Sequence, residues 1–146
     1  MLEKPTKQNI LIELHVPDFE IVKKFYSKLG FKIIWEREPE ENKGYLVMKL
    51  EQNILCFWGG NESIYKQKYF SQFPKNSSKG YGVEIILMIK NINNYYQKLI
   101  NSKIKISQPL STKPWGLSDF RIADPNGFYI RITSPHDIQD DKYAVK

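Results

Sequence analysis

The chain lacks several features that mark proteins outside the ordinary globular class. It has one cysteine, Cys56, in 146 residues, which excludes an internal disulfide and a cysteine-based zinc site. No apolar run approaches the ~18 residues that a membrane-spanning helix needs. The first residues contain no apolar stretch of the kind found in a signal peptide. We therefore expect a cytoplasmic protein with no membrane partner.

Concentrated charge of one sign is also missing. Lysine and arginine number 22 against 16 acidic residues, so the net charge is +6. The basic residues are interspersed with acids, and no block of like charges marks a phosphate-binding stripe. We expect no nucleic-acid partner. The hydrophobic share of 41% is enough for a folded core.

The first half of the chain predicts a strand, a helix and three further strands. Apolar residues alternate with others over 9–16, which indicates a strand with one buried face. Asp18 is a good helix N-cap, and apolar residues at spacings of three and four continue to Leu29, before a C-capping Gly30. The further strands are predicted at 31–38, 45–50 and 53–58.

The same order recurs in the second half. After a connection over 61–80, with a short helix near 64–70, the pattern predicts a strand at 83–89 and a helix from Asn91 to about Ser102. Strands follow at 103–108, 117–123 and 128–133, the last two joined by an Asn126-Gly127 turn. The segments 26–29 and 96–99 share Tyr-x-Lys-Leu. We predict an α+β fold of two tandem βαβββ modules, about 8–60 and 81–134, with a polar tail over 135–146.

Two segments carry a resemblance to a known family. These are Leu14-His15-Val16-Pro17-Asp18, leading to Phe25-Tyr26-Ser27-Lys28-Leu29-Gly30-Phe31, and Pro114-Trp115-Gly116-Leu117-Ser118-Asp119-Phe120, leading to Asp124-Pro125-Asn126-Gly127. They resemble the vicinal oxygen chelate superfamily of glyoxalase I, extradiol dioxygenases and bleomycin resistance proteins. The final hairpin is similar to the bleomycin-resistance branch. The resemblance implies that the two sheets curl into one cup-like mixed sheet and that the chain forms a homodimer.

The resemblance also implies where a metal would sit. Metal-dependent members hold a divalent ion at four inward strand positions, which here are Leu11, Cys56, Glu84 and Arg131. Leucine has no donor atom, and arginine is a fixed cation without a lone pair to offer. We therefore expect no metal and no cofactor. In its place we predict a Glu84–Arg131 ion pair, with the two side chains within about 6 Å.

Strand parity assigns the residues that share the open surface of the cup. The predicted ligand-binding residues are Glu13, His15, Trp58, Glu84, Met88, Tyr129 and Arg131, with Trp115 from the loop. The opposite parity, predicted to pack under the helices, comprises Ile10, Ile12, Leu14, Val83, Ile85, Leu87, Ile130 and Ile132. Plainer roles stay open. Glu13 and His15 could be surface groups, Trp58 and Tyr129 subunit contacts, and Trp115 a residue that packs on its own hairpin.

These features favour a metal-free protein that binds a small organic molecule. By its resemblance, it would sequester an antibiotic or another flat ligand, although the net charge of +6 opposes a cationic drug such as bleomycin. One alternative is a metal-dependent lyase, isomerase or dioxygenase with ligands rearranged to His15, Glu84 and Glu13. Another is a regulatory or structural dimer with weak nucleic-acid binding. Catalytic residues cannot be assigned from the sequence.

Overall fold

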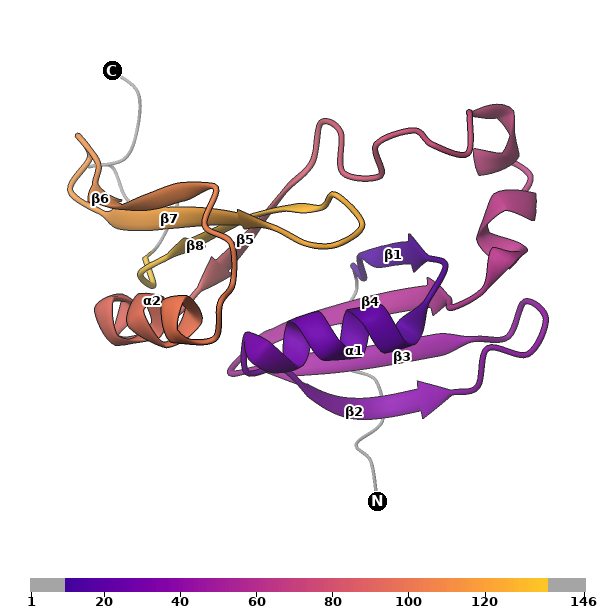
Figure 1. Cartoon of the computed structure of the whole chain (residues 1–146), viewed down its shortest axis with the longest axis horizontal. Coiled ribbons are helices and arrows are strands. Elements are labelled where there is room, and N and C mark those ends of the chain that lie inside the picture. Colours follow the sequence, from indigo (N-terminus) through magenta and orange to yellow (C-terminus); the bar gives the residue numbers. More distant parts are fainter. Residues whose placement is uncertain (1–9, 137–146) are drawn as a thin grey trace. The chain divides into compact units, whose positions relative to one another are not determined.

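The computed structural model describes residues 10–136 and divides between Ser78 and Lys79 into two compact units. Each unit contains a four-stranded mixed sheet with one helix (Figure 1). We call β1–β4 with α1 module one, and β5–β8 with α2 module two. The predicted α+β fold with two repeated modules is confirmed. Neither helix is long and apolar enough to cross a membrane in this part of the chain.

Module one has the strand order β1-β4-β3-β2. Strand β1 pairs in parallel with β4, and the other pairs are antiparallel. Two short 3₁₀ helices follow the sheet, η1 at Glu62–Lys66 and η2 at Phe70–Gln72. The main elements are β1 (Glu13–Val16), α1 (Phe19–Lys28), β2 (Lys32–Arg37), β3 (Tyr45–Leu50) and β4 (Asn53–Gly59).

Helix α1 begins and ends where its flanking residues predict. One carboxylate oxygen of Asp18 accepts hydrogen bonds from the backbone N–H groups of Glu20 and Ile21, at 2.8 and 3.4 Å. At the other end Gly30 has a φ of 99°, which only glycine adopts without strain. The helix then lies on the sheet, with the rings of Tyr26 and Phe57 5.1 Å apart.

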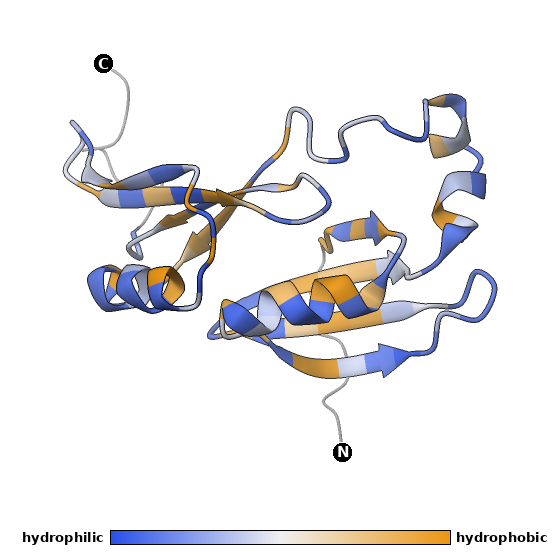
Figure 2. Cartoon of the chain, viewed as in Figure 1, coloured by the Kyte–Doolittle hydropathy of each residue, from blue (hydrophilic) through white to orange (hydrophobic). Residues whose placement is uncertain are grey.

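Module two repeats this arrangement in the order β5-β8-β7-β6, with β5 parallel to β8. Apolar and polar residues alternate along β7 and form stripes on α1 (Figure 2). The elements are β5 (Glu84–Met88), α2 (Ile92–Asn101), β6 (Gln108–Thr112), β7 (Ser118–Ala123) and β8 (Tyr129–Thr133). The fully buried core between sheet and helix includes Leu87, Leu99, Phe120, Ile122, Ile130 and Ile132.

For three residues the prediction of a core position is wrong. Ile10 is 80% exposed, Ile12 60% and Val83 50%. Each precedes the first paired residue of its strand, since β1 begins at Glu13 and β5 at Glu84. A residue without a sheet partner is not held against the helix, so strand parity does not apply to it. The predicted start of the first strand at residue 9, and residues 137–146 of the predicted tail, lie outside the described residues.

The sixth strand is displaced from its prediction. A strand was expected over 103–108, but β6 covers Gln108–Thr112 and so includes Pro109. Proline is tolerated there because β6 is an edge strand and its register shifts between Gln108 and Ser111. Residues 103 and 104 instead close helix α2, where the Ile104 N–H donates to the Leu99 carbonyl at 3.1 Å.

The predicted helix start at Asn91 and the predicted turn at Asn126-Gly127 are both present, but the interactions that form them differ from those expected. Asn91 precedes α2, yet it has a left-handed backbone and its side chain makes no capping bond. In the β7–β8 turn only Gly127, with a φ of 91°, has a positive φ, and Asn126 does not. The carboxylate of Asp124 holds this turn by accepting N–H groups of Asn126 and Phe128, at 2.8 and 2.9 Å.

We predict that Asp124→Ala destabilises the protein by about 2 kcal/mol, because it leaves the buried Phe128 N–H without its acceptor. Asp18→Ala is the matched comparison, since it removes the N-cap of α1 and should cost about 1 kcal/mol. Urea unfolding followed by circular dichroism measures both. An Asp124→Ala protein with the unfolding midpoint of the wild type would contradict this role for Asp124.

Candidate functional site

Each sheet has one face under its helix and one open face on the other side. In module one, Glu13 pairs with Cys56, and the next row places His15, Trp58 and Tyr45 side by side. Their neighbours of opposite parity, including Leu14 and Phe57, are buried toward α1. We call Glu13, His15, Tyr45, Cys56 and Trp58 the module-one open face. Three of the predicted site residues therefore lie together there.

His15 joins the aromatic and acidic parts of this face. Its Nε2 lies 3.0 Å from Glu13 Oε1. Its ring centroid lies 4.8 Å from that of Trp58 and 5.1 Å from that of Phe70 in η2. Its Nδ1 is buried and has no hydrogen-bond partner among residues 10–136. The carboxylate thus orients an imidazole that has a tilted contact with Trp58 and an edge-on contact with Phe70.

Tyr45 and Cys56 add two protonated groups to the same face. Burial raises the pKa of the Tyr45 phenol, and contacts with Cys56 and Glu13 raise it further. Burial also raises the pKa of the Cys56 thiol, which the hydrogen bond from Tyr45 only partly offsets. Both groups therefore remain neutral at physiological pH. Sequence reasoning missed Tyr45, because it lies at the start of β3 and the register of that strand depends on the β3–β4 turn.

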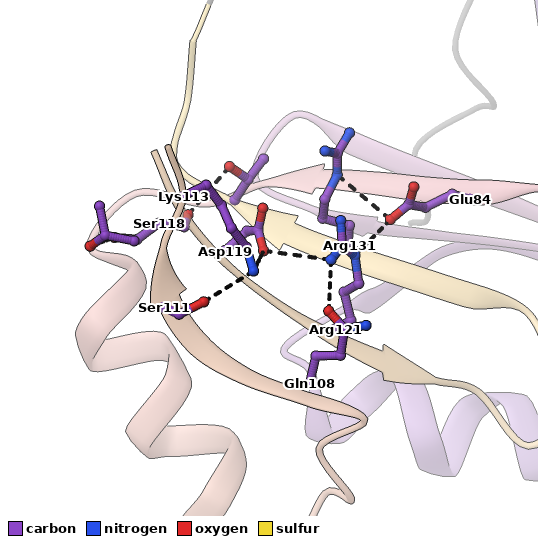
Figure 3. Close-up of polar contacts among 10 residues, drawn as sticks. Glu84, Gln108, Ser111, Lys113, Ser118, Asp119, Arg121 and Arg131 are labelled. Atoms are coloured by element: carbon purple, nitrogen blue, oxygen red, sulfur yellow. Dashed lines mark hydrogen bonds and ion pairs between the residues drawn. The ribbon is translucent and has the colours of Figure 1, made fainter. Parts of the chain in front are cut away.

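Module two presents charged side chains on its open face (Figure 3). Arg131 on β8 has Ile86 as its partner on β5 and Arg121 as its partner on β7. One row away, Glu84 is the partner of Tyr129. We call Glu84, Asp119, Arg121, Tyr129 and Arg131, together with Lys113 from the loop after β6, the module-two open face.

The predicted Glu84–Arg131 contact is present, with Arg131 Nε 3.7 Å from Glu84 Oε1. The closer partner is Arg121, whose Nε donates to the same oxygen at 2.9 Å. Sequence reasoning missed Arg121, although its strand parity could have identified it. One carboxylate oxygen therefore faces two guanidinium groups.

The surrounding contacts leave this face with one positive charge in excess. Asp119 is buried, and its Oδ1 lies 3.5 Å from Lys113 Nζ and 4.0 Å from Arg121 Nη1. Burial of Arg121 lowers its pKa, but the hydrogen bond to Glu84 and the charge of Asp119 outweigh this and raise it overall. Lys113, Arg121 and Arg131 thus face two carboxylates.

The remaining predicted residues lie around these faces. Met88 is half-buried in β5 opposite Thr133. Trp115 is 47% exposed in the turn that joins β6 to β7, where Gly116 has a φ of 90°. Leu11 precedes β1 and is 46% exposed. Within residues 10–136, no group of three His, Cys, Asp or Glu side chains could hold a metal ion.

We predict that stability falls as pH rises above about 8.5, because the unfolded chain releases the Cys56 proton before the folded chain does. The raised pKa leaves stability unaffected at lower pH, where both states keep the proton. Urea unfolding at a series of alkaline pH values measures the loss, and Cys56→Ala is the control that should show a smaller one. Identical pH profiles for the two proteins would contradict the raised thiol pKa.

Comparison with known proteins agrees with this architecture. Residues 10–132 match the family model described as the Glyoxalase/Bleomycin resistance protein/Dioxygenase superfamily. No curated protein sequence matches the chain significantly.

Solved structures share the fold at low identity. A bleomycin resistance determinant encoded on transposon Tn5 is 17% identical with a TM-score of 0.65, over 90% of this chain and 100% of its own. A bleomycin-binding protein solved in complex with bleomycin is 18% identical with a TM-score of 0.62, over 89% and 100%. A glyoxalase family protein from Enterococcus faecalis is 22% identical with a TM-score of 0.63, over 88% and 98%. From the family match over most of its length, the chain belongs to the glyoxalase/bleomycin resistance protein/dioxygenase superfamily.

Proposed function

We propose that this protein binds a small, flat organic molecule without the help of a metal ion. The observation that carries the proposal is that the Glu84 carboxylate is already paired with positively charged side chains. Its carboxylate is the one acidic group among the four positions at which the family resemblance places a metal, and it faces two guanidinium groups. A divalent cation would have to displace both fixed positive charges before it reached that oxygen.

The other three positions support the same conclusion. Leu11 has no donor atom, and Arg131 is itself a cation. The Cys56 thiol keeps its proton because burial raises its pKa, and a metal would need the thiolate. The alternative of a metal enzyme with rearranged ligands is not favoured, since His15 and Glu13 bond to each other.

The shape of the ligand follows from the module-one open face. Trp58 and His15 lie in ring contact, and Tyr45 is the strand partner of Trp58. Aromatic side chains offer a large contact area at a low cost in conformational entropy, which suits a flat molecule. In module two, exposed Trp115 is a separate candidate for stacking on a ligand. A structural neighbour solved with bleomycin supports the idea that this fold can hold an organic ligand.

The setting of the protein is also part of the proposal. We propose a cytoplasmic homodimer with no nucleic-acid partner. In the described part of the chain the outer strands of each sheet, such as β2 and β6, have one unpaired edge, and such edges favour association. Light scattering coupled to gel filtration measures the oligomeric state. A monomer at micromolar concentration would contradict the dimer and leave the ligand proposal intact.

The first test is metal content. Protein purified without chelators should contain far less than one divalent ion per chain, measured by inductively coupled plasma mass spectrometry. The reason is that the positive charges of Arg121 and Arg131 lie beside Glu84 and repel a divalent cation. Stoichiometric zinc, nickel, manganese or iron would overturn the metal-free proposal and favour the enzyme.

The second test is ligand binding. Calorimetric titration with a panel of flat aromatic compounds should find a ligand, and Trp58→Ala should weaken its binding by about tenfold or more. Phe73→Ala is the matched control, because Phe73 is a half-exposed aromatic residue in the connection between the modules. Equal losses in both variants, or no binding across the panel, would contradict the proposal.

A further inference from the structure

We infer that the module-two open face binds an organic oxyanion, a carboxylate or a phosphate monoester, through the guanidinium group of Arg131. This inference rests on the proposed function, because it names the chemical group of the ligand that module two would recognise. The evidence is an arginine with an unused donor, a local excess of positive charge, and apolar surface beside it.

At least one hydrogen-bond donor of Arg131, its Nε–H, is not used by the residues that the structure describes. Its side chain is only 25% exposed, and its Nε is buried without a hydrogen-bond partner among the described residues. Its ion-pair partner atom, Glu84 Oε1, is 3.7 Å away, which is beyond hydrogen-bond distance. A guanidinium group carries five N–H donors, and covering it without an acceptor costs free energy. A bound oxyanion would supply the missing acceptor.

Glu84 does not supply the missing acceptor for Arg131, because it is already bonded to Arg121. The Nε of Arg121 donates to Glu84 Oε1 at 2.9 Å, and its Nη1 donates to Gln108 Oε1 at 2.8 Å. The carboxylate is therefore committed to Arg121, which is fixed at both ends of its guanidinium group. Arg131 stands directly opposite Arg121 in the antiparallel pair β7–β8. Like charges opposite each other repel, so a further anion is favoured at this position.

The charged side chains of the module-two open face indicate what charge that anion should carry. Asp119 is shared by Lys113 and Arg121, and Glu84 by Arg121 and Arg131. Three cations and two carboxylates leave a net charge of +1 on this face. A group with one negative charge neutralises it. A cationic ligand is disfavoured by the same count.

The residues beside Arg131 indicate an organic molecule and not a free inorganic ion. Ile86, the β5 partner of Arg131, is 40% exposed. Tyr129, the partner of Glu84, lies on the same face. Apolar surface next to a guanidinium group fits a hydrocarbon or aryl body that carries an acid group. The planar fork of arginine matches two oxygens of a carboxylate or phosphate.

The direct test follows the Nε–Hε signals of arginine by nuclear magnetic resonance in ¹⁵N-labelled protein. Benzoate and phenyl phosphate should each shift the Arg131 signal in a saturable way, and neutral benzamide should not, because it lacks the charge. Benzamide acting like benzoate would overturn the oxyanion inference. Inorganic phosphate binding as tightly as phenyl phosphate would overturn the organic part of it. No shift with any probe would overturn it entirely.

Variants assign the effect to Arg131. Arg131→Gln should weaken benzoate binding by about tenfold or more, and Arg131→Lys should recover only part of it, since lysine keeps the charge but loses the fork. Lys105→Gln is the matched control, because it removes one charge from an exposed site in module two. An equal loss in Arg131→Gln and Lys105→Gln would overturn the assignment. The wild-type titration decides the question if a variant does not fold.

The same experiments separate this inference from the proposed function. Neutral flat ligands that bind and depend on Trp58, together with no response of Arg131 to benzoate, would overturn the oxyanion site alone. Saturable benzoate binding at Arg131, with no flat ligand that depends on Trp58, would support the oxyanion site and overturn the aromatic platform.

Discussion

A single carboxylate oxygen facing two guanidinium groups is the constraint around which module two is organised. Parallel pairing of β5 with β8 and antiparallel pairing of β7 with β8 bring Glu84 and two arginines to one face. Without Glu84, the only carboxylate that the described residues place near the two opposed arginines would be Asp119, 4.0 Å from Arg121. Partly exposed ion pairs add little stability, so their importance lies in what the face can recognise. In the proposed function, the pairing of this carboxylate with fixed positive charge is what disfavours a metal ion and favours an organic ligand.

The sequence predicts those parts of the fold in which local chemistry and tertiary packing agree. Strand β3 lies at the predicted residues 45–50, where its mostly apolar sequence suits a strand that is paired on both sides. Asp18 and Gly30 delimit α1 through hydrogen bonds and a positive φ that their residue types favour. Strand β6 lies later in the chain than its predicted position. Proline is disfavoured in a central strand but tolerated in an edge strand, and a sequence does not reveal which strand is the edge.

In the candidate site, too, the sequence predicts which face a residue lies on but not the register between strands. Strand parity was enough to predict that Glu84 and Arg131 share a face and approach each other. It could also have placed Arg121 on this face, but it does not show which residue of β7 stands opposite Arg131, because that depends on the β7–β8 turn. A two-residue Asn126-Gly127 turn would have placed Ile122 there. The observed turn instead has one positive φ and is closed by the Gly127 N–H on the Asp124 carbonyl, which shifts the register and brings in Arg121.

The two open faces differ in chemistry although the modules share an architecture. The faces under the helices stay aliphatic and aromatic in both modules, because burial against α1 or α2 demands it. No such demand acts on the open faces. Module one therefore carries rings, a protonated thiol and a histidine–carboxylate pair, whereas module two carries guanidinium groups with one charge in excess. The shared architecture therefore constrains the buried faces of the two modules and leaves the chemistry of each open face to be set by its own strands.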